Sequence, residues 1–258
     1  MSTAPSAGTE PWMRETLRRG FESLSAGRIE DASACCRKVL SARRDLPEGH
    51  FLVGLIALEL KETGRAVQAF GSVTKLQPDH AAAWANLARL FMRAGQSARA
   101  DAALAKAVEH NDNNPIVLDL IGTIHGLLGD QAEAGKWIQR ALKKQPENIA
   151  FQINLANNHM FLDQLDDAEA LLASVLKRAP GHPNAHWLLS GLRKAKNRDH
   201  IDELRRLVEG ERDNPRALAF LYYGLGKELE DLEDWDNAFE AFARGAAARR
   251  TTIDFDEA

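Results

Sequence analysis

The chain has 258 residues, of which 45% are hydrophobic and 27% charged, and its formal net charge is -4. This composition is typical of an ordinary globular protein and lacks the positive charge of nucleic-acid-binding surfaces, so neither DNA nor RNA is expected as a partner. The longest apolar stretch is broken by Gly54 and Glu59, and the first residues lack the pattern of a secretory signal. Two adjacent cysteines, Cys35 and Cys36, suit a reducing compartment. We therefore predict a cytoplasmic protein that does not bind membranes.

The chain begins with residues rich in Ser, Ala, Gly and Pro. Residues 1–11 contain little apolar surface to offset the entropy of ordering, so a disordered segment is expected there. Residues 12–250 are predicted to form one elongated repeat domain, because repeated units grow by addition. Residues 251–258 are expected to form a tail or the start of a linker to a further domain that this chain lacks.

Small residues recur at intervals of 34 residues through the predicted repeat domain. A repeat of this length indicates stacked helical hairpins, since one hairpin cannot bury its apolar face alone. The first series, in the first helix of each unit, comprises Gly20, Gly54, Ala88, Gly122, Ala156 and Ser190. The second series, in the second helix, comprises Ala32, Ala66, Ala100, Ala134 and Ala168.

The fourth unit, residues 115–148, shows how one hairpin is specified. Gly129 can take the left-handed conformation that ends a first helix, and Asp130 can cap the second. Small side chains at Gly122 and Ala134 predict a close approach of the two helix backbones.

The pattern within each unit resembles the tetratricopeptide repeat (TPR), a helix-turn-helix motif of the same length. The third unit carries the motif residues Trp84, Leu87, Ala88, Phe91, Ala100, Leu104 and Ala107. The resemblance implies an all-α fold, a right-handed α-solenoid of about seven TPR units. It also implies that the first helices line a concave groove that binds a protein or peptide.

The sixth unit, at about residues 183–218, departs from the repeat. Asp202 replaces the expected alanine, and the following unit is displaced by two residues. We expect helices with altered packing in this unit, and a return to the pattern at Gly226.

The last unit has a second resemblance. Residues 219–239 read AFLYYGLGKELEDLEDWDNAF and are followed by Gly245 and the pair Arg249 and Arg250. This segment resembles the stretch before the catalytic domain of bacterial TPR-containing sulfotransferases, which use 3'-phosphoadenosine 5'-phosphosulfate (PAPS). The resemblance implies a non-catalytic, substrate-presenting or regulatory region of such an enzyme, with the groove facing its partner or its own catalytic domain. The alternative is a free-standing TPR adaptor that assembles a bacterial complex.

Several residues invite a catalytic interpretation that their context does not support. The sequence Gly224-Leu225-Gly226-Lys227 lacks the following Ser or Thr and the preceding strand of a phosphate-binding loop. His125 and His159 occupy equivalent positions, which favours packing over metal binding, and Pro183 is expected to separate His182 from His186 at a helix start. No catalytic residue, cofactor or metal site is therefore expected within residues 1–258.

The groove supplies the candidate binding residues. Asn86 and Arg89 belong to the third unit, and Asn154 and Asn157 belong to the fifth. Asparagines at such positions can hold a peptide backbone through paired amide bonds, and the competing interpretation is local bonding between helices. Leucines interrupt the series at equivalent positions in the intervening units, namely Leu52, Leu120 and Leu188.

Overall fold

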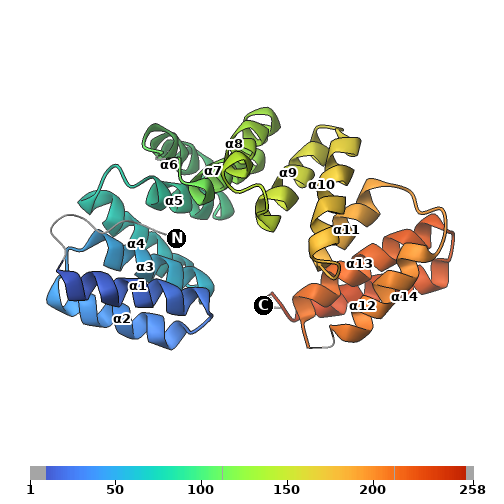
Figure 1. Cartoon of the computed structure of the whole chain (residues 1–258), viewed down its shortest axis with the longest axis horizontal. Helices are drawn as coiled ribbons and strands as arrows, with labels where there is room; N and C mark the ends of the chain where they lie inside the picture. The colour runs from blue at the N-terminus through green and yellow to red at the C-terminus, as the bar shows by residue number, and fades with distance from the viewer. Residues whose placement is uncertain (1–9, 112, 212, 254–258) are drawn as a thin grey trace. The chain divides into compact units, whose positions relative to one another are not determined.

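The computed structural model describes residues 10–111, 113–211 and 213–253. These residues form fourteen α-helices and no strand (Figure 1), which confirms the prediction of an all-α fold. The helices belong to two compact units, Met1–Lys144 (unit 1) and Gln145–Ala258 (unit 2). Most of the predicted disordered segment, residues 1–11, lies outside the described residues, as does most of the predicted tail.

Unit 1 consists of four helical hairpins. Each odd-numbered helix packs on the next even-numbered helix, and contacts from α2 to α3, α4 to α5 and α5 to α7 join successive hairpins. Buried Leu17, Val39 and Ile56 belong to one continuous core of the first three helices. The helices are α1 Pro11–Ser25, α2 Ile29–Ala42, α3 Pro47–Glu59, α4 Thr63–Leu76, α5 Ala81–Arg93, α6 Ser97–Glu109, α7 Pro115–Leu127 and α8 Gln131–Lys144.

Unit 2 begins with a hairpin of the same kind and then changes. The α9–α10 hairpin shares a core with α11, whereas α12, α13 and α14 share a second core. The helices are α9 Ile149–Phe161, α10 Leu165–Arg178, α11 Pro183–Leu192, α12 Asp199–Gly210, α13 Pro215–Asp231 and α14 Trp235–Arg250. No helix within the described ranges has both the length and the apolar character needed to cross a bilayer.

Local sequence signals set the helix ends. Gly129 has a φ of +94°, and the Asp130 carboxylate accepts a hydrogen bond from the Glu133 amide at 3.0 Å. Both predictions for this turn are therefore confirmed. Proline occupies a first-turn position, where the missing amide costs no hydrogen bond, in five helices. These prolines are Pro11, Pro47, Pro115, Pro183 and Pro215.

The small residues of the repeat allow the two helices of a hairpin to touch, as the sequence predicts. A Cβ atom added to Gly122 would lie 2.7 Å from Ile138 Cγ1 and 2.9 Å from the Ala134 carbonyl oxygen. A Cβ atom on Gly54 would lie 2.6 Å from the Phe70 ring. Interiors packed this closely have no room for the extra atom.

The irregularity at residues 183–218 has a specific cause. Helix α11 packs directly on α13, and α12 also packs on α13. Ser190, which continues the small-residue series of Gly122, faces Gly224 of α13, where an added Cβ would lie 3.1 Å from its Oγ. Gly226, two residues later, lies against Phe242 of α14. Helix α13 therefore acts as the second helix for α11 and as the first helix for α14.

Candidate functional site

The predicted residues of unit 1, Asn86 and Arg89, contact each other on α5. Asn86 is buried, and its Nδ2 donates to the Ala82 carbonyl oxygen at 2.8 Å. Arg89 Nη2 donates to Asn86 Oδ1 at 3.0 Å. Burial lowers the pKa of Arg89, nearby Arg93 lowers it further, and Glu59 acts in the opposite direction. The amide of Asn86 is thus already engaged within its own helix, and the half-buried Arg89 is the more available group of the pair.

The predicted residues of unit 2, Asn154 and Asn157, lie on α9 in different environments. Asn154 is half-buried and Asn157 is exposed. Residues three apart on a helix share a face, so Met160 continues this surface after Asn157. Asn86 and Arg89 belong to one compact unit, and Asn154 and Asn157 belong to the other.

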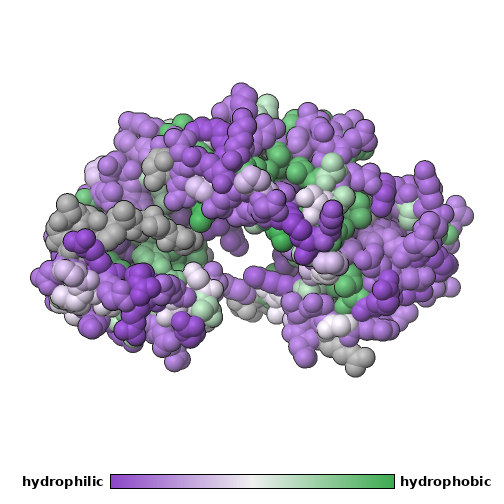
Figure 2. Space-filling view, in the orientation of Figure 1, coloured by the Kyte–Doolittle hydropathy of each residue, from purple (hydrophilic) through white to green (hydrophobic). Residues whose placement is uncertain are grey.

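Unit 2 also exposes aromatic surface that the sequence analysis missed. Trp187 on α11 is 40% exposed, and its ring centroid lies 5.5 Å from that of Phe220 on α13. Met160 Cε lies 3.9 Å from the position of a Cβ atom on Gly191, one turn after Trp187. We call Asn157, Met160, Trp187 and Phe220 the aromatic face of unit 2. Figure 2 shows apolar residues at the surface over α9, on a view that is otherwise mainly hydrophilic.

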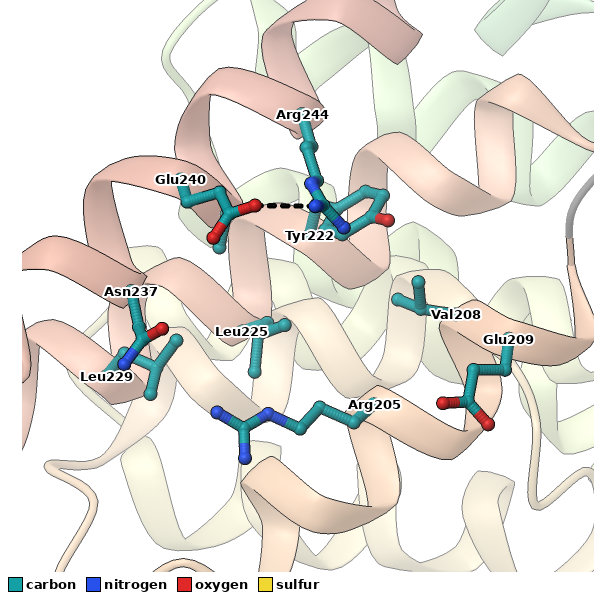
Figure 3. A pocket seen from close by; sticks show the side chains of 10 residues that line it. Arg205, Val208, Glu209, Tyr222, Leu225, Leu229, Asn237, Glu240 and Arg244 are labelled. Atoms are coloured by element: carbon teal, nitrogen blue, oxygen red, sulfur yellow. Dashed lines mark hydrogen bonds and ion pairs between the residues drawn. The ribbon is translucent and has the colours of Figure 1, made fainter.

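A cleft of about 230 Å³ lies between α12, α13 and α14 (Figure 3). Arg205 reaches in from α12 and Arg244 from α14, where Arg244 pairs with Glu240 at 2.5 Å. A hydrogen bond with Tyr222, together with Glu240, raises the pKa of Arg244. Two arginines and two glutamates line the cleft, so their formal charges balance. The lining residues are Arg205, Val208, Glu209, Tyr222, Leu225, Leu229, Asn237, Glu240, Ala241 and Arg244.

A chain of buried polar groups joins α11, α12 and α13. His186 Nε2 lies 2.6 Å from the Pro180 carbonyl oxygen, and His186 Nδ1 lies 2.8 Å from His200 Nε2. His200 Nδ1 lies 2.5 Å from Glu228 Oε1, which also accepts from Ser190 Oγ at 3.0 Å. His186, Ser190 and Glu228 are each less than 5% exposed. His186 and Ser190 lie one turn apart on α11, whereas His200 lies on α12 and Glu228 on α13, so no local sequence pattern predicts the whole chain of contacts.

A family model described as tetratricopeptide repeat matches residues 57–124 and 128–192, just over half of the chain. The chain belongs to the tetratricopeptide-repeat family. This assignment and the helical hairpins support the α-solenoid fold predicted from sequence. TPR domains are protein–protein interaction scaffolds, and that is the functional class of this chain.

Known TPR proteins resemble the chain at low identity. Anaphase-promoting complex subunit 3 of Schizosaccharomyces pombe is 24% identical over 141 residues, 55% of this chain and 21% of that protein. The chain thus spans about a fifth of the length of the curated relatives it matches. The thermophilic TPR protein TTC0263 of Thermus thermophilus has a TM-score of 0.59 at 19% identity, covering 70% of this chain and 98% of that one. Human IFIT1 has a TM-score of 0.74 at 16% identity, covering 92% of this chain and 58% of that one. These structural likenesses show the fold alone.

The remaining chemical candidates have structural roles in the TPR framework. Residues 224–227 lie inside α13, where Lys227 Nζ donates to the Arg193 carbonyl oxygen at 2.5 Å, so they form no phosphate loop. His125 Nδ1 lies 4.0 Å from the Asp130 carboxylate at the hairpin turn, and His159 contacts Gln164 at the equivalent place. Pro183 does begin a helix after His182, which caps α11 by accepting from the Ala185 amide at 3.3 Å.

Proposed function

We propose that this TPR protein is a non-catalytic scaffold that binds an extended peptide segment of a protein partner on the aromatic face of unit 2. The observation that carries the proposal is the half-exposed Trp187 beside Phe220. Tryptophan is among the residues that contribute most to binding energy at protein interfaces, because one ring buries a large area at little entropic cost.

The polar residues beside this aromatic surface suit a peptide backbone. Asn157 is exposed on the same face of α9 as Met160, and Asn154 lies one turn before it. A side-chain amide can both donate to and accept from a peptide group, so it satisfies the backbone of an extended segment. Apolar side chains of the same segment would then pack on Met160 and Trp187.

In unit 1 we propose a separate binding surface at Asn86 and Arg89. Asn86 supports this surface by holding the Arg89 guanidinium, and Arg89 supplies a positive charge for an acidic side chain of a protein partner. Glu59 lies close enough to influence the pKa of Arg89, so this charge is partly balanced within the unit.

A random peptide library displayed on phage and selected on the immobilised chain tests the proposal. Peptides recovered from the selection are expected to contain apolar side chains and to bind the purified protein in solution. Trp187→Ala should weaken that binding about 30-fold or more, since hot-spot truncations cost about 2 kcal/mol or more. Asn154→Ala should weaken binding less and leave the melting temperature nearly unchanged.

The matched control is Trp235→Ala. Trp235 is 61% exposed at the start of α14, outside the aromatic face, so its removal is expected to leave peptide affinity unchanged. Equal losses at Trp187 and Trp235, or a library that yields no binding peptide, would refute a binding role for the aromatic face. A large stability loss without a binding defect in Asn154→Ala would assign Asn154 to structure.

A second candidate follows from the resemblance of residues 219–239 to the segment before a PAPS-dependent sulfotransferase domain. Trp235 and Phe239 on α14 are 61% and 76% exposed, so aromatic surface is available where a further domain would pack. Under this second hypothesis, the scaffold presents substrates to the sulfotransferase domain or regulates that domain. Cys35 and Cys36 are free thiols, which supports a reducing, cytoplasmic location for such a bacterial protein.

The reading frame beyond residue 258 separates the sulfotransferase scaffold from a free-standing adaptor. A strand followed by a phosphate-binding loop supports the sulfotransferase, and the longer protein should then bind 3'-phosphoadenosine 5'-phosphate while residues 1–258 do not. A stop codon directly after Ala258 would support the adaptor.

A further inference from the structure

The polar chain between α11, α12 and α13 contains two histidines whose protonation follows from their neighbours. The Pro180 carbonyl oxygen can only accept, so His186 Nε2 must donate to it across 2.6 Å. The Glu228 carboxylate accepts at Oε1, so His200 Nδ1 is the donor across 2.5 Å. A neutral imidazole carries one proton, so the other two ring nitrogens, His186 Nδ1 and His200 Nε2, are left with lone pairs.

These two lone-pair nitrogens face each other. They are 2.8 Å apart, and the two ring planes differ by 27°. Lone pairs at this distance repel each other unless a cation lies between them. The cation can be a third proton shared by the two rings or a metal ion bound by both.

A carboxylate stands beside the two nitrogens. Glu203 follows His200 by one turn of α12. A Glu203 carboxylate oxygen, one ring nitrogen of His186 and one ring nitrogen of His200 all lie within 4.8 Å of one another. Glu203 and His200 are half-buried, whereas His186 is 1% exposed. The three side chains are therefore buried on the α11 side and accessible to an ion from solvent on the α12 side.

We propose that His186, His200 and Glu203 form a Zn²⁺ site with one coordination position open to water. Two imidazole nitrogens and one carboxylate oxygen are a ligand set that Zn²⁺ accepts with a fourth position open. Mg²⁺ and Ca²⁺ prefer oxygen ligands alone and fit this set poorly.

The surroundings of the two histidines match those of metal ligands. A ligating histidine commonly donates its second ring N–H to a carboxylate or a backbone carbonyl, which fixes the tautomer and the ring orientation. Here the Pro180 carbonyl oxygen accepts from His186, and the Glu228 carboxylate accepts from His200. Ser190 in turn holds the Glu228 carboxylate. The groups that would orient the two imidazole ligands are thus in place.

A metal ion fits between the two facing ring nitrogens after a small movement of the rings. The neutral ring is the form that binds Zn²⁺. At Zn–N distances of about 2.0–2.1 Å, a tetrahedral angle places two nitrogens about 3.3 Å apart, so the rings need to separate by about 0.5 Å.

A bound ion would join α11 to α12. These consecutive helices do not form a hairpin with each other, because each packs on α13. The site would therefore strengthen the contact between α11 and α12, and Zn²⁺ binding would stabilise unit 2 by an amount that rises with the logarithm of the free Zn²⁺ concentration above the Kd.

A zinc titration of the full chain tests the proposal. The protein, stripped with a chelator, is titrated with Zn²⁺ at neutral pH in competition with a chromogenic chelator. One equivalent is expected to bind and to raise the melting temperature. Co²⁺ in place of Zn²⁺ should give the visible absorption of a four-coordinate site.

Variants locate the site. Glu203→Gln, at a half-buried position, is expected to keep the fold and to weaken Zn²⁺ binding by about tenfold or more, and His200→Gln by more than that. His182→Asn is the matched control, because it removes a histidine from the same segment while an asparagine can still cap α11. Its Zn²⁺ affinity should equal that of the wild type.

Two results would overturn the proposal. One is the absence of saturable Zn²⁺ binding, or binding that Glu203→Gln and His200→Gln leave unchanged. The other is a protein whose melting temperature does not change with Zn²⁺ but falls as the pH is raised, which would assign the space between the rings to a shared proton.

Discussion

Units 1 and 2 begin with the same hairpin, but they differ in what a first helix packs against. In unit 1 the first helix of every hairpin packs on the helix that follows it, with a small residue such as Gly54 or Gly122 at the contact. In unit 2, α11 packs on α13 instead of on α12, the next helix in sequence. Ser190 and Gly224 lie at this contact. The repeat thus tolerates a changed partner, provided that the new helix also offers a small residue at the contact.

The change of partner also changes the chemistry of the interface. The Gly122 contact in unit 1 is made with Ile138 and helix backbone. The α11–α13 contact instead includes the hydroxyl of Ser190 and the carboxylate of Glu228, and the two imidazoles extend this polar chain. Buried polar groups are costly unless they are hydrogen-bonded, so unit 2 depends on a complete network where unit 1 depends on close packing.

The largest expected effect comes from removing the apolar anchor of α12. Leu204 is fully buried in the core that α12 shares with α13 and α14. Leu204→Ala should lower the free energy of unfolding by about 2–5 kcal/mol, because it leaves a cavity. Hydrogen exchange followed by mass spectrometry should show lost amide protection in α11–α14 and unchanged protection in unit 1.

The exposed Glu209 on the same helix provides the control, since Glu209→Ala should change stability by less than about 0.5 kcal/mol. Equal loss of protection in both units after Leu204→Ala would show that the two units do not unfold separately.

A smaller effect is expected at the close contact in unit 1. Gly122→Ala adds a Cβ atom 2.9 Å from a backbone oxygen of α8, and backbone cannot yield as a side chain does. The free energy of unfolding should fall by about 1–3 kcal/mol in urea denaturation, and Ala134→Leu should have a similar effect by overpacking.

Gly71→Ala is the matched variant for Gly122→Ala. Gly71 also lies inside a helix, α4, but an added Cβ would meet nothing within 4 Å. This variant should be more stable than the wild type by about 0.5–1 kcal/mol, since alanine is the better helix former. Destabilisation by both substitutions would contradict the assignment of the cost at Gly122 to crowding.

The smallest effect concerns the segment between α11 and α12. Asp231 accepts from the Ala195 amide at 2.8 Å and from Lys227 Nζ at 2.6 Å, which holds this segment on α13. Partial burial raises the pKa of Asp231, but the hydrogen bonds from Lys227 and the Ala195 amide outweigh it, so the net pKa is lowered. A carboxyl with a lowered folded pKa contributes stability above its unfolded pKa of about 3.9, and this stability is lost as the pH falls through the folded pKa.

Asp231→Asn should therefore cost about 1 kcal/mol at neutral pH and should flatten the fall in melting temperature below about pH 4. Thermal melts recorded across the acid range measure both effects. Asp213→Asn, at an exposed carboxylate between α12 and α13, should retain the wild-type profile. If the melting temperature of Asp231→Asn falls with pH in parallel with that of the wild type, Asp231 does not contribute to the acid dependence of stability.

Much of the fold could be predicted because its signals are local or repeat along the chain. The turn at Gly129 and Asp130 depends on residues within one helical turn of each other. The contact at Gly122 depends on a spacing that recurs every 34 residues. The departure at Asp202 was also visible in the sequence, as a gap in that spacing.

The candidate sites were less predictable. Asn86 has the same repeat position as Asn154, but only the structure shows that its amide is held by Arg89 and by its own helix. The exposure of Trp187 depends on which helices lie beside α11, and no local pattern reports that. His182 and His186 are close in sequence, but the imidazole that His186 contacts is that of His200, from the next helix.

The sequence by itself determined the helices, their turns, the regular hairpins and the family, because helix propensity, capping and side-chain size act within a few residues or at a fixed repeat. Only the tertiary structure decided which helix covers α11. That choice depends on the packing and hydrogen bonding of α11, α12 and α13 together, which no short segment encodes. It places Ser190 against Glu228, brings His186 to His200 and sets Trp187 beside Phe220.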